Sequence, residues 1–409
     1  MRVKDLVGKR IECTCGKVHE IPRIDILPVR AEEVVSSSTK ALFLVDENTA
    51  SLVEVPRERC LLLDGSERVL ATMENVEKTM EKLRDYEEIV SIGSGTLTDI
   101  ARYAAFLIGK DFSCVPTAPS VDAYTSTVAP ILVHGVKKTF KAKPPRRIFL
   151  DTEILKNAPF DLLRAGVGDI AAKVIARMDW VLSNAFTGEY LCDFVWEDLK
   201  DVLKEVFKST SNVLKREEKA VEVLTEGLLV SGLNMTIVGN SRPASGAEHM
   251  VSHMVEMYYE EKGKFPPFHG LTVAVGTFVA MKAYELIVNG IELPKEDFSL
   301  AERKRELKEM FEEEKVREFL KTYKEKKIPK VDLNKARKMI LNVYEEYFPL
   351  LEDALEEIGV RDLIEDLGRE LLAKIVRLSN TIRDRFTVLD ILDSERTLKS
   401  FSEWVIQQV

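Results

Sequence analysis

The chain has 409 residues, of which 45% are hydrophobic and 31% are charged, and its formal net charge at pH 7 is -9. This length exceeds what one hydrophobic core ordinarily serves, so it predicts two domains of a globular protein. The negative charge provides no basic surface of the kind that nucleic-acid binding requires, and we expect no nucleic-acid partner.

The sequence contains no apparent membrane-spanning or secretory segment. We expect that no apolar run reaches the length of a membrane span, and the N-terminal MRVKDLVGKR lacks the apolar core of a signal peptide. The five cysteines are an odd number without a framework spacing, which is typical of a reducing compartment. We therefore expect a cytoplasmic protein without a membrane partner.

The N-terminal segment pairs Cys13 with Cys15 and places His19 nearby. This pattern could bind zinc, but structural zinc sites use four ligands and a fourth is not evident. We interpret the segment as a β-turn at Gly16 that carries two thiols near solvent.

Short apolar runs then predict a parallel sheet with helices between its strands. The predicted strands span 41–45, 60–64, 89–92, 112–116 and 147–150, and a helix is expected over 75–84. Residues 128–133 and 136–140 predict a hairpin in which His134, next to Gly135, is a turn residue rather than a ligand.

A glycine-rich turn follows the strand 89–92 directly. Residues 93–99 read GSGTLTD, and the apolar spacing of the residues after them predicts a helix. A strand, a glycine-rich turn and a helix N-terminus together can bind phosphate through exposed N–H groups. Because the third glycine of the usual dinucleotide motif is missing, a tight turn capped by Thr96 is the alternative. The polar loop after the strand 112–116 should lie beside this turn, at the carboxyl ends of the strands.

The pattern changes after Pro159, because the remainder shows helical periods and almost no strand signal. We predict an α/β domain over 1–160 and an all-helical domain over 161–409. Within the first predicted helix, Asp169 and Lys173 lie one turn apart. They could form a surface ion pair, or Asp169 could serve a metal or ligand in space left by Gly168.

Three of the five histidines fall between Ser241 and Gly270. His249 and His253 are four residues apart and share one helix face, while His269 opens the next apolar run. Imidazole is a common metal ligand, and Asp169 is our candidate for the third ligand that a site would need. Two core histidines and one loop histidine would explain the same pattern.

Several of these segments together resemble the sn-glycerol-1-phosphate dehydrogenases, a family related to iron-type alcohol dehydrogenases, glycerol dehydrogenases and dehydroquinate synthases. They are GSGTLTD, PTAPSVDAYTS, VKKTFKAKPP, GVGDIAAK and SRPASGAEHMVSH, collinear from about residue 40 to 280. The N-terminal cysteine segment and the long helical tail are similar to the bacterial branch. The resemblance implies a nucleotide-binding α/β domain with a Rossmann-like parallel sheet, an all-α domain, and an active site in the cleft between them.

The resemblance also implies roles for individual residues. The NAD(P) pyrophosphate would contact Gly93, Ser94, Gly95, Thr96 and Asp99, and the nicotinamide side would be lined by Thr117, Ala118, Pro119, Ser120 and Ser126. One divalent ion would be bound by Asp169, His249 and His269, and the catalytic residues would be Asp122, Asp169 and His253. Asn234, Gly239 and Asn240 depart from the small residues usual in the family, which affects the expected shape of the substrate pocket. Asp46 at a strand end favours a ribose contact and hence NAD, without excluding NADP.

The implied activity is the reversible, metal-dependent reduction of dihydroxyacetone phosphate to sn-glycerol-1-phosphate. Zinc, nickel and iron all suit the ligands, and the substrate phosphate could meet Lys137, Lys138, Lys173 or Arg242. We expect a homo-oligomer, a dimer or larger. The alternatives are a related polyol dehydrogenase, a dehydroquinate-synthase-like lyase and a metal-bound nucleotide sensor. Asp169 disfavours the lyase, whose carboxylate ligand is typically Glu.

Overall fold

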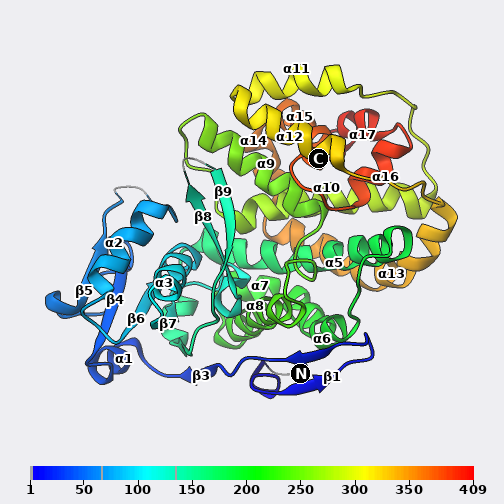
Figure 1. The fold of residues 1–409 in the computed structure, drawn as a ribbon. Coiled ribbons are helices and arrows are strands. Elements are labelled where there is room, and N and C mark those ends of the chain that lie inside the picture. Colours follow the sequence, from blue (N-terminus) through cyan, green and yellow to red (C-terminus); the bar gives the residue numbers. More distant parts are fainter. Residues whose placement is uncertain (1–2, 66–67, 134–135) are drawn as a thin grey trace. The chain divides into compact units, whose positions relative to one another are not determined.

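The computed structural model describes residues 3–65, 68–133 and 136–409 (Figure 1). The chain forms two compact units, which we call the sheet unit, residues 1–166 and 197–241, and the helical unit, residues 167–196 and 242–409. Each unit is therefore built from two separate stretches of the chain. The division at residue 160 that the sequence predicts stays a prediction.

The sheet unit contains a six-stranded parallel sheet in the order β3-β10-β7-β6-β4-β5. Its strands are β3 (Asp25–Pro28), β4 (Ala41–Asp46), β5 (Cys60–Leu63), β6 (Glu88–Gly93), β7 (Asp111–Pro116) and β10 (Arg147–Leu150). The five predicted strands are confirmed. Because β5 lies on one side of β4 and β6 on the other, the strand order reverses at β4.

Helices pack against the sheet, which is why its strands consist largely of apolar residues. They are α1 (Ala31–Ser37), α2 (Met73–Leu83), α3 (Gly95–Leu107) and α4 (Thr152–Lys156), and α3 lies against β6 and β7 (Figure 1). The side chains of Phe43, Val90 and Ile92 are fully buried in one cluster with Val115. Thr72 begins α2 because its side chain accepts a hydrogen bond from the backbone N–H of Asn75.

Two antiparallel hairpins accompany the sheet. The N-terminal hairpin joins β1 (Arg10–Glu12) to β2 (Val18–Glu20), and the second joins β8 (Val128–Val133) to β9 (Val136–Lys141). The predicted turn at Gly16 is present, with a backbone φ of 83° that favours glycine. The predicted turn at His134 lies outside the described residues. The sequence analysis missed β1, β2 and β3, which are only three or four residues long.

Three helices from the second stretch complete the sheet unit. They are α6 (Phe194–Lys208), whose first turn belongs to the helical unit, α7 (Thr210–Leu214) and α8 (Glu218–Val238). Short 3-10 turns lie at Val3–Asp5, Arg57–Arg59 and, as η3, Asp122–Thr125. The helix α8 packs against η3, so it contributes to the loop that follows β7.

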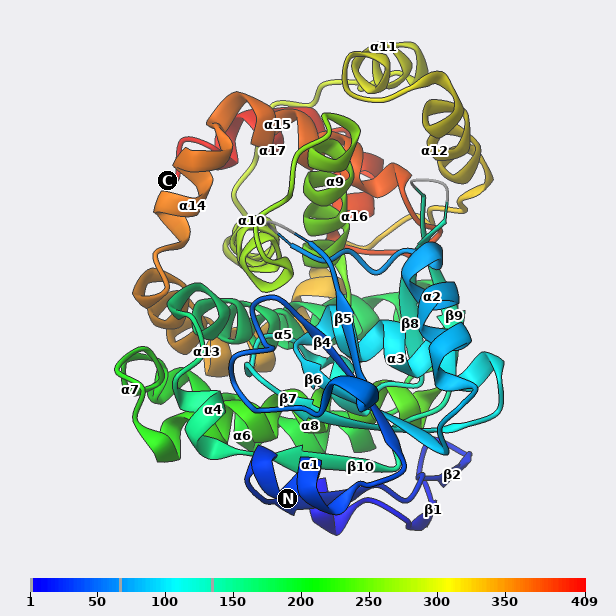
Figure 2. The same cartoon turned by 90° about the vertical axis from the view of Figure 1, so that its left-hand side faces the viewer.

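The helical unit contains no strand, because no strand follows Leu150 in the described chain. Its helices are α5 (Phe160–Thr187, from Val167 onward), α9 (Ala247–Glu261), α10 (His269–Asn289), α11 (Leu300–Met310), α12 (Glu313–Glu325), α13 (Leu333–Glu357), α14 (Val360–Leu367), α15 (Arg369–Leu378), α16 (Val388–Ser394) and α17 (Leu398–Val405), with a 3-10 turn, η4, at Ser379–Thr381. The C-terminus lies beside α14 and α15 (Figure 2), where Arg361 donates to the carbonyl of Gln408 at 3.0 Å.

Two helices, α8 and α10, are long and apolar enough to cross a membrane, which corrects the expectation that no run reaches that length. Their apolar windows are 67% and 94% buried within the protein. Buried core helices pass the same test of length and composition, so this result does not by itself indicate a membrane protein.

Candidate functional site

The helical unit brings the three predicted metal ligands together. Asp169 lies on α5, His249 on α9, and His269 is the first residue of α10. One donor atom from each lies within 4.8 Å of the others. Two imidazoles and one carboxylate fit a divalent transition metal and leave a coordination position for another molecule.

Glycines set the spacing of the helices that carry these ligands. A Cβ added at Gly168 would lie 2.2 Å from the carbonyl oxygen of Gly270, so α5 and α10 touch through their backbones next to Asp169 and His269. A Cβ added at Gly276 would lie 2.1 Å from the carbonyl oxygen of Glu248, which precedes His249. A side chain at either glycine would force the ligands apart.

The imidazole of each of the two predicted histidine ligands is held by a buried carboxylate. His249 Nδ1 lies 2.9 Å from Glu248 Oε1, and His269 Nδ1 lies 2.6 Å from Glu256 Oε1. An Nδ1–H that donates to a carboxylate leaves Nε2 with the lone pair that binds a metal. The sequence analysis missed Glu248 and Glu256, because acidic residues on a helix usually indicate only a solvated face.

The third histidine, His253, differs from His249 and His269 because its Nδ1 accepts a hydrogen bond instead of donating one. Its ring centroid lies 5.9 Å from that of His249 and 5.7 Å from that of His269, so the three rings form one group. Its Nδ1 lies 3.3 Å from Nη2 of Arg383. Because a guanidinium only donates, Nδ1 accepts and Nε2 of a neutral ring carries the proton. In this arrangement a neutral His253 carries an N–H beside the two predicted histidine ligands.

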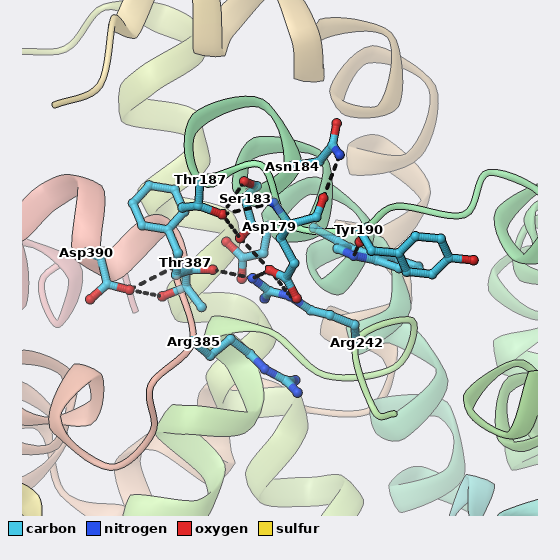
Figure 3. A network of polar contacts seen from close by, with 12 residues as sticks. Asp179, Ser183, Asn184, Thr187, Tyr190, Arg242, Arg385, Thr387 and Asp390 are labelled. Carbon is cyan, nitrogen blue, oxygen red and sulfur yellow. Dashed lines mark hydrogen bonds and ion pairs between the residues drawn. The ribbon is translucent and has the colours of Figure 1, made fainter. Parts of the chain in front are cut away.

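Buried carboxylates anchor the start of α9 behind the metal ligands. Glu248 accepts from the backbone N–H of Gly246 at 2.6 Å, and Asp179 accepts from that of Ala247 at 2.6 Å. Asp179 also accepts from the hydroxyl of Tyr284 at 2.6 Å. Burial raises the pKa of both carboxyl groups to about 7. The network around Asp179 (Figure 3) thus fixes the helix end from which His249 projects.

The predicted phosphate-binding cations differ in their surroundings. Lys173 is fully buried and lies 3.0 Å from Asp169, so their ion pair is not the surface pair that we considered. Arg242 is also buried and donates to Glu189 at 2.6 Å and to the carbonyl of Phe386 at 2.9 Å (Figure 3). Lys138 is exposed, and the side chain of Lys137 lies outside the described residues.

Two further arginines, which the sequence analysis missed, lie in the helical unit. Arg383 contacts His253, and Arg385 donates to the carbonyl of Ser245 at 2.6 Å. Burial lowers the pKa of Arg385 to about 9, and the charges of Arg242 and Arg383 act in the same direction. Positively charged guanidinium groups that are held close together and partly buried favour the binding of an anion.

The sheet unit holds the predicted nucleotide-binding residues at one edge of the sheet. The strand β6 ends at Gly93, and α3 begins at Gly95 with Ser94 as its N-cap. Thr117 donates from its backbone to the carbonyl of Gly93 at 3.2 Å, which brings the loop after β7 beside this turn. Asp46 ends β4, the strand at which the order reverses. In open parallel sheets, ligands bind beyond the carboxyl ends of strands at such a reversal.

Most residues of the predicted nicotinamide loop are packed rather than exposed. Thr117, Ala118, Pro119, Ser120 and Ser126 are all buried. Tyr124 donates to the carbonyl of Ala118 at 2.6 Å. A Cβ added at Gly95 would lie 2.8 Å from the side chain of Val121. The glycine-rich turn and the loop after β7 are therefore in direct contact.

Asp99 and Asp122 both have structural partners. Asp99 forms a buried ion pair with Arg102 at 2.6 Å, and Arg102 donates to the carbonyl of Val128 at 2.9 Å. Asp122 accepts from the hydroxyl of Ser231 at 2.8 Å. A Cβ added at Gly232 would lie 2.1 Å from the carbonyl oxygen of Asp122, so this glycine lets α8 approach the loop.

Comparisons with known proteins agree with this architecture. A family model described as iron-containing alcohol dehydrogenase matches residues 33–159. The chain is 31% identical over 301 residues to the glycerol-1-phosphate dehydrogenase (NAD(P)+) of Halalkalibacterium halodurans, covering 68% of this chain and 75% of that protein. It is 28% identical over 402 residues to the protein of the same name from Bacillus subtilis, covering 91% and 93%.

Solved structures share the fold at low sequence identity. An iron-containing alcohol dehydrogenase from Thermococcus thioreducens superposes with a TM-score of 0.61 at 13% identity, covering 94% of this chain and 99% of that one. A sulfoacetaldehyde reductase from Bifidobacterium kashiwanohense in complex with NAD+ gives a TM-score of 0.58 at 14% identity, covering 94% and 97%. These matches support the observed parallel sheet and helical part.

Proposed function

Because the chain belongs to the glycerol-1-phosphate dehydrogenase family, we propose that it catalyses the reversible reduction of dihydroxyacetone phosphate to sn-glycerol-1-phosphate with NADH or NADPH. The observation that carries this proposal is the convergence of Asp169, His249 and His269, with both imidazoles oriented by buried carboxylates. Such a site suits a redox reaction at a carbonyl group.

The three ligands would hold one zinc, nickel or iron ion. When bound, the metal supplies a Lewis acid that polarises the substrate carbonyl and stabilises the developing alkoxide. Glu248 and Glu256 keep the Nδ1 protons in place, so that both Nε2 atoms face the site. His253, whose Nδ1 accepts from Arg383, would give a proton from Nε2 to the alkoxide oxygen and take it back in the reverse reaction.

The nucleotide would bind at the sheet edge. Gly93, Ser94, Gly95 and Thr96 would hold the pyrophosphate at the N-terminus of α3, where N–H groups and the helix dipole favour an anion. The loop after β7 would line the nicotinamide, and Asp46 would accept from the ribose hydroxyls, which favours NAD. Asp99, with Arg102, would brace this loop in addition to the cofactor role expected from resemblance.

The substrate phosphate would meet Arg383 and Arg385, and Asp122 would accept from a substrate hydroxyl. Lys173 already donates to Asp169, and Arg242 already donates to Glu189, so both have fewer N–H groups to donate to a phosphate. A dianion would compensate the crowded guanidinium charges, whereas a substrate without phosphate would leave them uncompensated. We also propose a cytoplasmic homo-oligomer.

Initial rates with five substrates, two for reduction and three for oxidation, test this function. Dihydroxyacetone phosphate should exceed free dihydroxyacetone in kcat/KM by roughly 100-fold or more, since charged hydrogen bonds are lost without the phosphate. In the oxidative direction, sn-glycerol-1-phosphate should be preferred over both its enantiomer and glycerol. The His249→Ala variant should lose metal and activity together.

Each alternative function has its own outcome in these assays. Comparable turnover of glycerol would favour a polyol dehydrogenase, and phosphate release without a net change in nicotinamide absorbance would favour the lyase. Binding of NAD and metal without turnover of any of the five substrates would favour a nucleotide sensor.

A further inference from the structure

A second group of metal-ligating side chains lies in the N-terminal hairpin of the sheet unit, apart from the residues that the proposed reaction uses. Cys13, Cys15 and His19 each place a donor atom within 4.8 Å of the others. The Sγ of Cys15 lies 3.4 Å from Nε2 of His19. Two thiols and an imidazole are the donor set that zinc prefers in structural sites.

The backbone of the hairpin holds the two cysteines at its turn. Cys13 donates from its backbone to the carbonyl of Lys17 at 3.0 Å, and Gly16 donates to the carbonyl of Cys13 at 3.0 Å. The chain reverses its direction at this turn, where Gly16 takes the left-handed conformation with a φ of 83°. The turn therefore fixes the positions of the cysteines through its own hydrogen bonds.

The orientation of His19 is the second observation that points to a metal. Its ring is 4% exposed, and its Nδ1 lies 3.0 Å from the carbonyl oxygen of Ile237 on the last turn of α8. Because a carbonyl only accepts, Nδ1 carries the proton and Nε2 presents its lone pair toward the cysteines. A metal-bound imidazole ordinarily has this outer hydrogen bond to a carbonyl or carboxylate.

We infer that Cys13, Cys15 and His19 bind a zinc ion, distinct from the divalent ion of the proposed reaction, that fastens the N-terminal hairpin to α8. Two thiolates neutralise the charge of the ion, and a further side chain would complete the four ligands that a structural zinc site uses. The same helix carries Ser231 and Gly232, which hold Asp122. The zinc ion thus stabilises the helix against which the loop after β7 packs.

Metal analysis of the purified full-length chain tests the site. We expect two metal equivalents per chain, one of them zinc, and a loss of one equivalent in Cys15→Ser and in His19→Ala. Cys60→Ser, which removes a half-buried thiol from β5, is the matched control and should keep both. His249→Ala should lose only the other equivalent. Unchanged metal content in both Cys15→Ser and His19→Ala overturns the inference.

Cobalt substitution reports the ligands without any measurement of activity. The cobalt-loaded chain should show thiolate-to-cobalt charge-transfer absorption that persists in His249→Ala and disappears in Cys15→Ser. If the cysteine variants do not fold, titration of the natural chain with an organomercurial should release one equivalent of zinc to a colorimetric chelator. The absence of thiolate absorption, or a lack of zinc release as the thiols react, would refute the site.

Discussion

The carboxylate of Glu256 offers a sharp test of how the proposed metal site is held. In the Glu256→Gln variant, the amide keeps the shape of the side chain and can still accept from Nδ1 of His269 through its oxygen. The variant loses the negative charge of the carboxylate, whose Oε1 lies 2.6 Å from Nδ1 of His269. Glu256 is 3% exposed, so water does not replace this charge. The ring becomes a poorer metal ligand, because a charge-assisted hydrogen bond is roughly twice as strong as a neutral one.

The expected cost is about 1.4–2.7 kcal/mol of metal-binding free energy, which corresponds to a 10- to 100-fold weaker Kd. The assay is a competitive titration of metal-free protein with zinc in the presence of a chelator of known affinity, followed at constant pH. The metal-free variant should unfold at nearly the same temperature as the metal-free natural chain, so that the effect lies in ligation and not in folding.

Glu285→Gln is the matched control, because it removes a carboxylate from α10, the helix that carries His269, where Glu285 pairs with Lys282 at 2.8 Å. This variant should bind the metal with unchanged affinity. If Glu256→Gln binds the metal within a factor of two of the natural chain, then the carboxylate does not position His269 and our reading of the site is wrong.

The remaining predictions concern the cofactor, the helix contacts and pH. Gly95→Val should abolish NAD binding in a calorimetric titration while the fold survives, because a side chain there meets Val121 and blocks the pyrophosphate. Unchanged affinity would exclude this turn as the phosphate site. Gly168→Ala should lower the free energy of unfolding by about 1–3 kcal/mol and weaken metal binding, since its Cβ would meet Gly270; urea unfolding that matches the natural chain would contradict this. Burial raises the pKa of Asp198 to about 6, above its unfolded value, so its contribution to stability is present at low pH and lost as pH rises through 6. Asp198→Asn should therefore be more stable by about 1–3 kcal/mol at pH 8, by linkage, and the difference should vanish near pH 4; a pH-independent difference would refute it.

The parallel sheet and the grouping of Asp169, His249 and His269 could be predicted because their signals are local or concentrated. Runs such as residues 41–45 and 89–92 are short and wholly apolar, and three histidines within thirty residues of a histidine-poor chain suggest a shared role. The carboxylates behind the ligands could not be predicted, since Glu256 acts on a histidine that only the packing of α9 against α10 brings near.

Long-range packing also explains the other omissions. Nothing near Ser231 in the sequence shows that its hydroxyl meets Asp122, a residue 109 positions earlier. Arg383 and Arg385 stand in a segment with no recognisable motif, and only the folded chain brings Arg383 to His253. The helical pattern of residues 197–241 indicates helices but does not show that they belong with the sheet.

The interleaving of the two units has a consequence for how the protein is made. When synthesis reaches Gly166, the sheet still lacks residues 197–241, which complete its unit. At synthesis rates of about 5–20 residues per second, α8 follows roughly 4–15 s later, so the loop that carries Asp122 waits uncovered on the ribosome. Asp169 waits longer, until His249 and His269 have emerged. Metal loading at the proposed site would therefore be a late event, and every newly made chain would pass through a metal-free state before it could work.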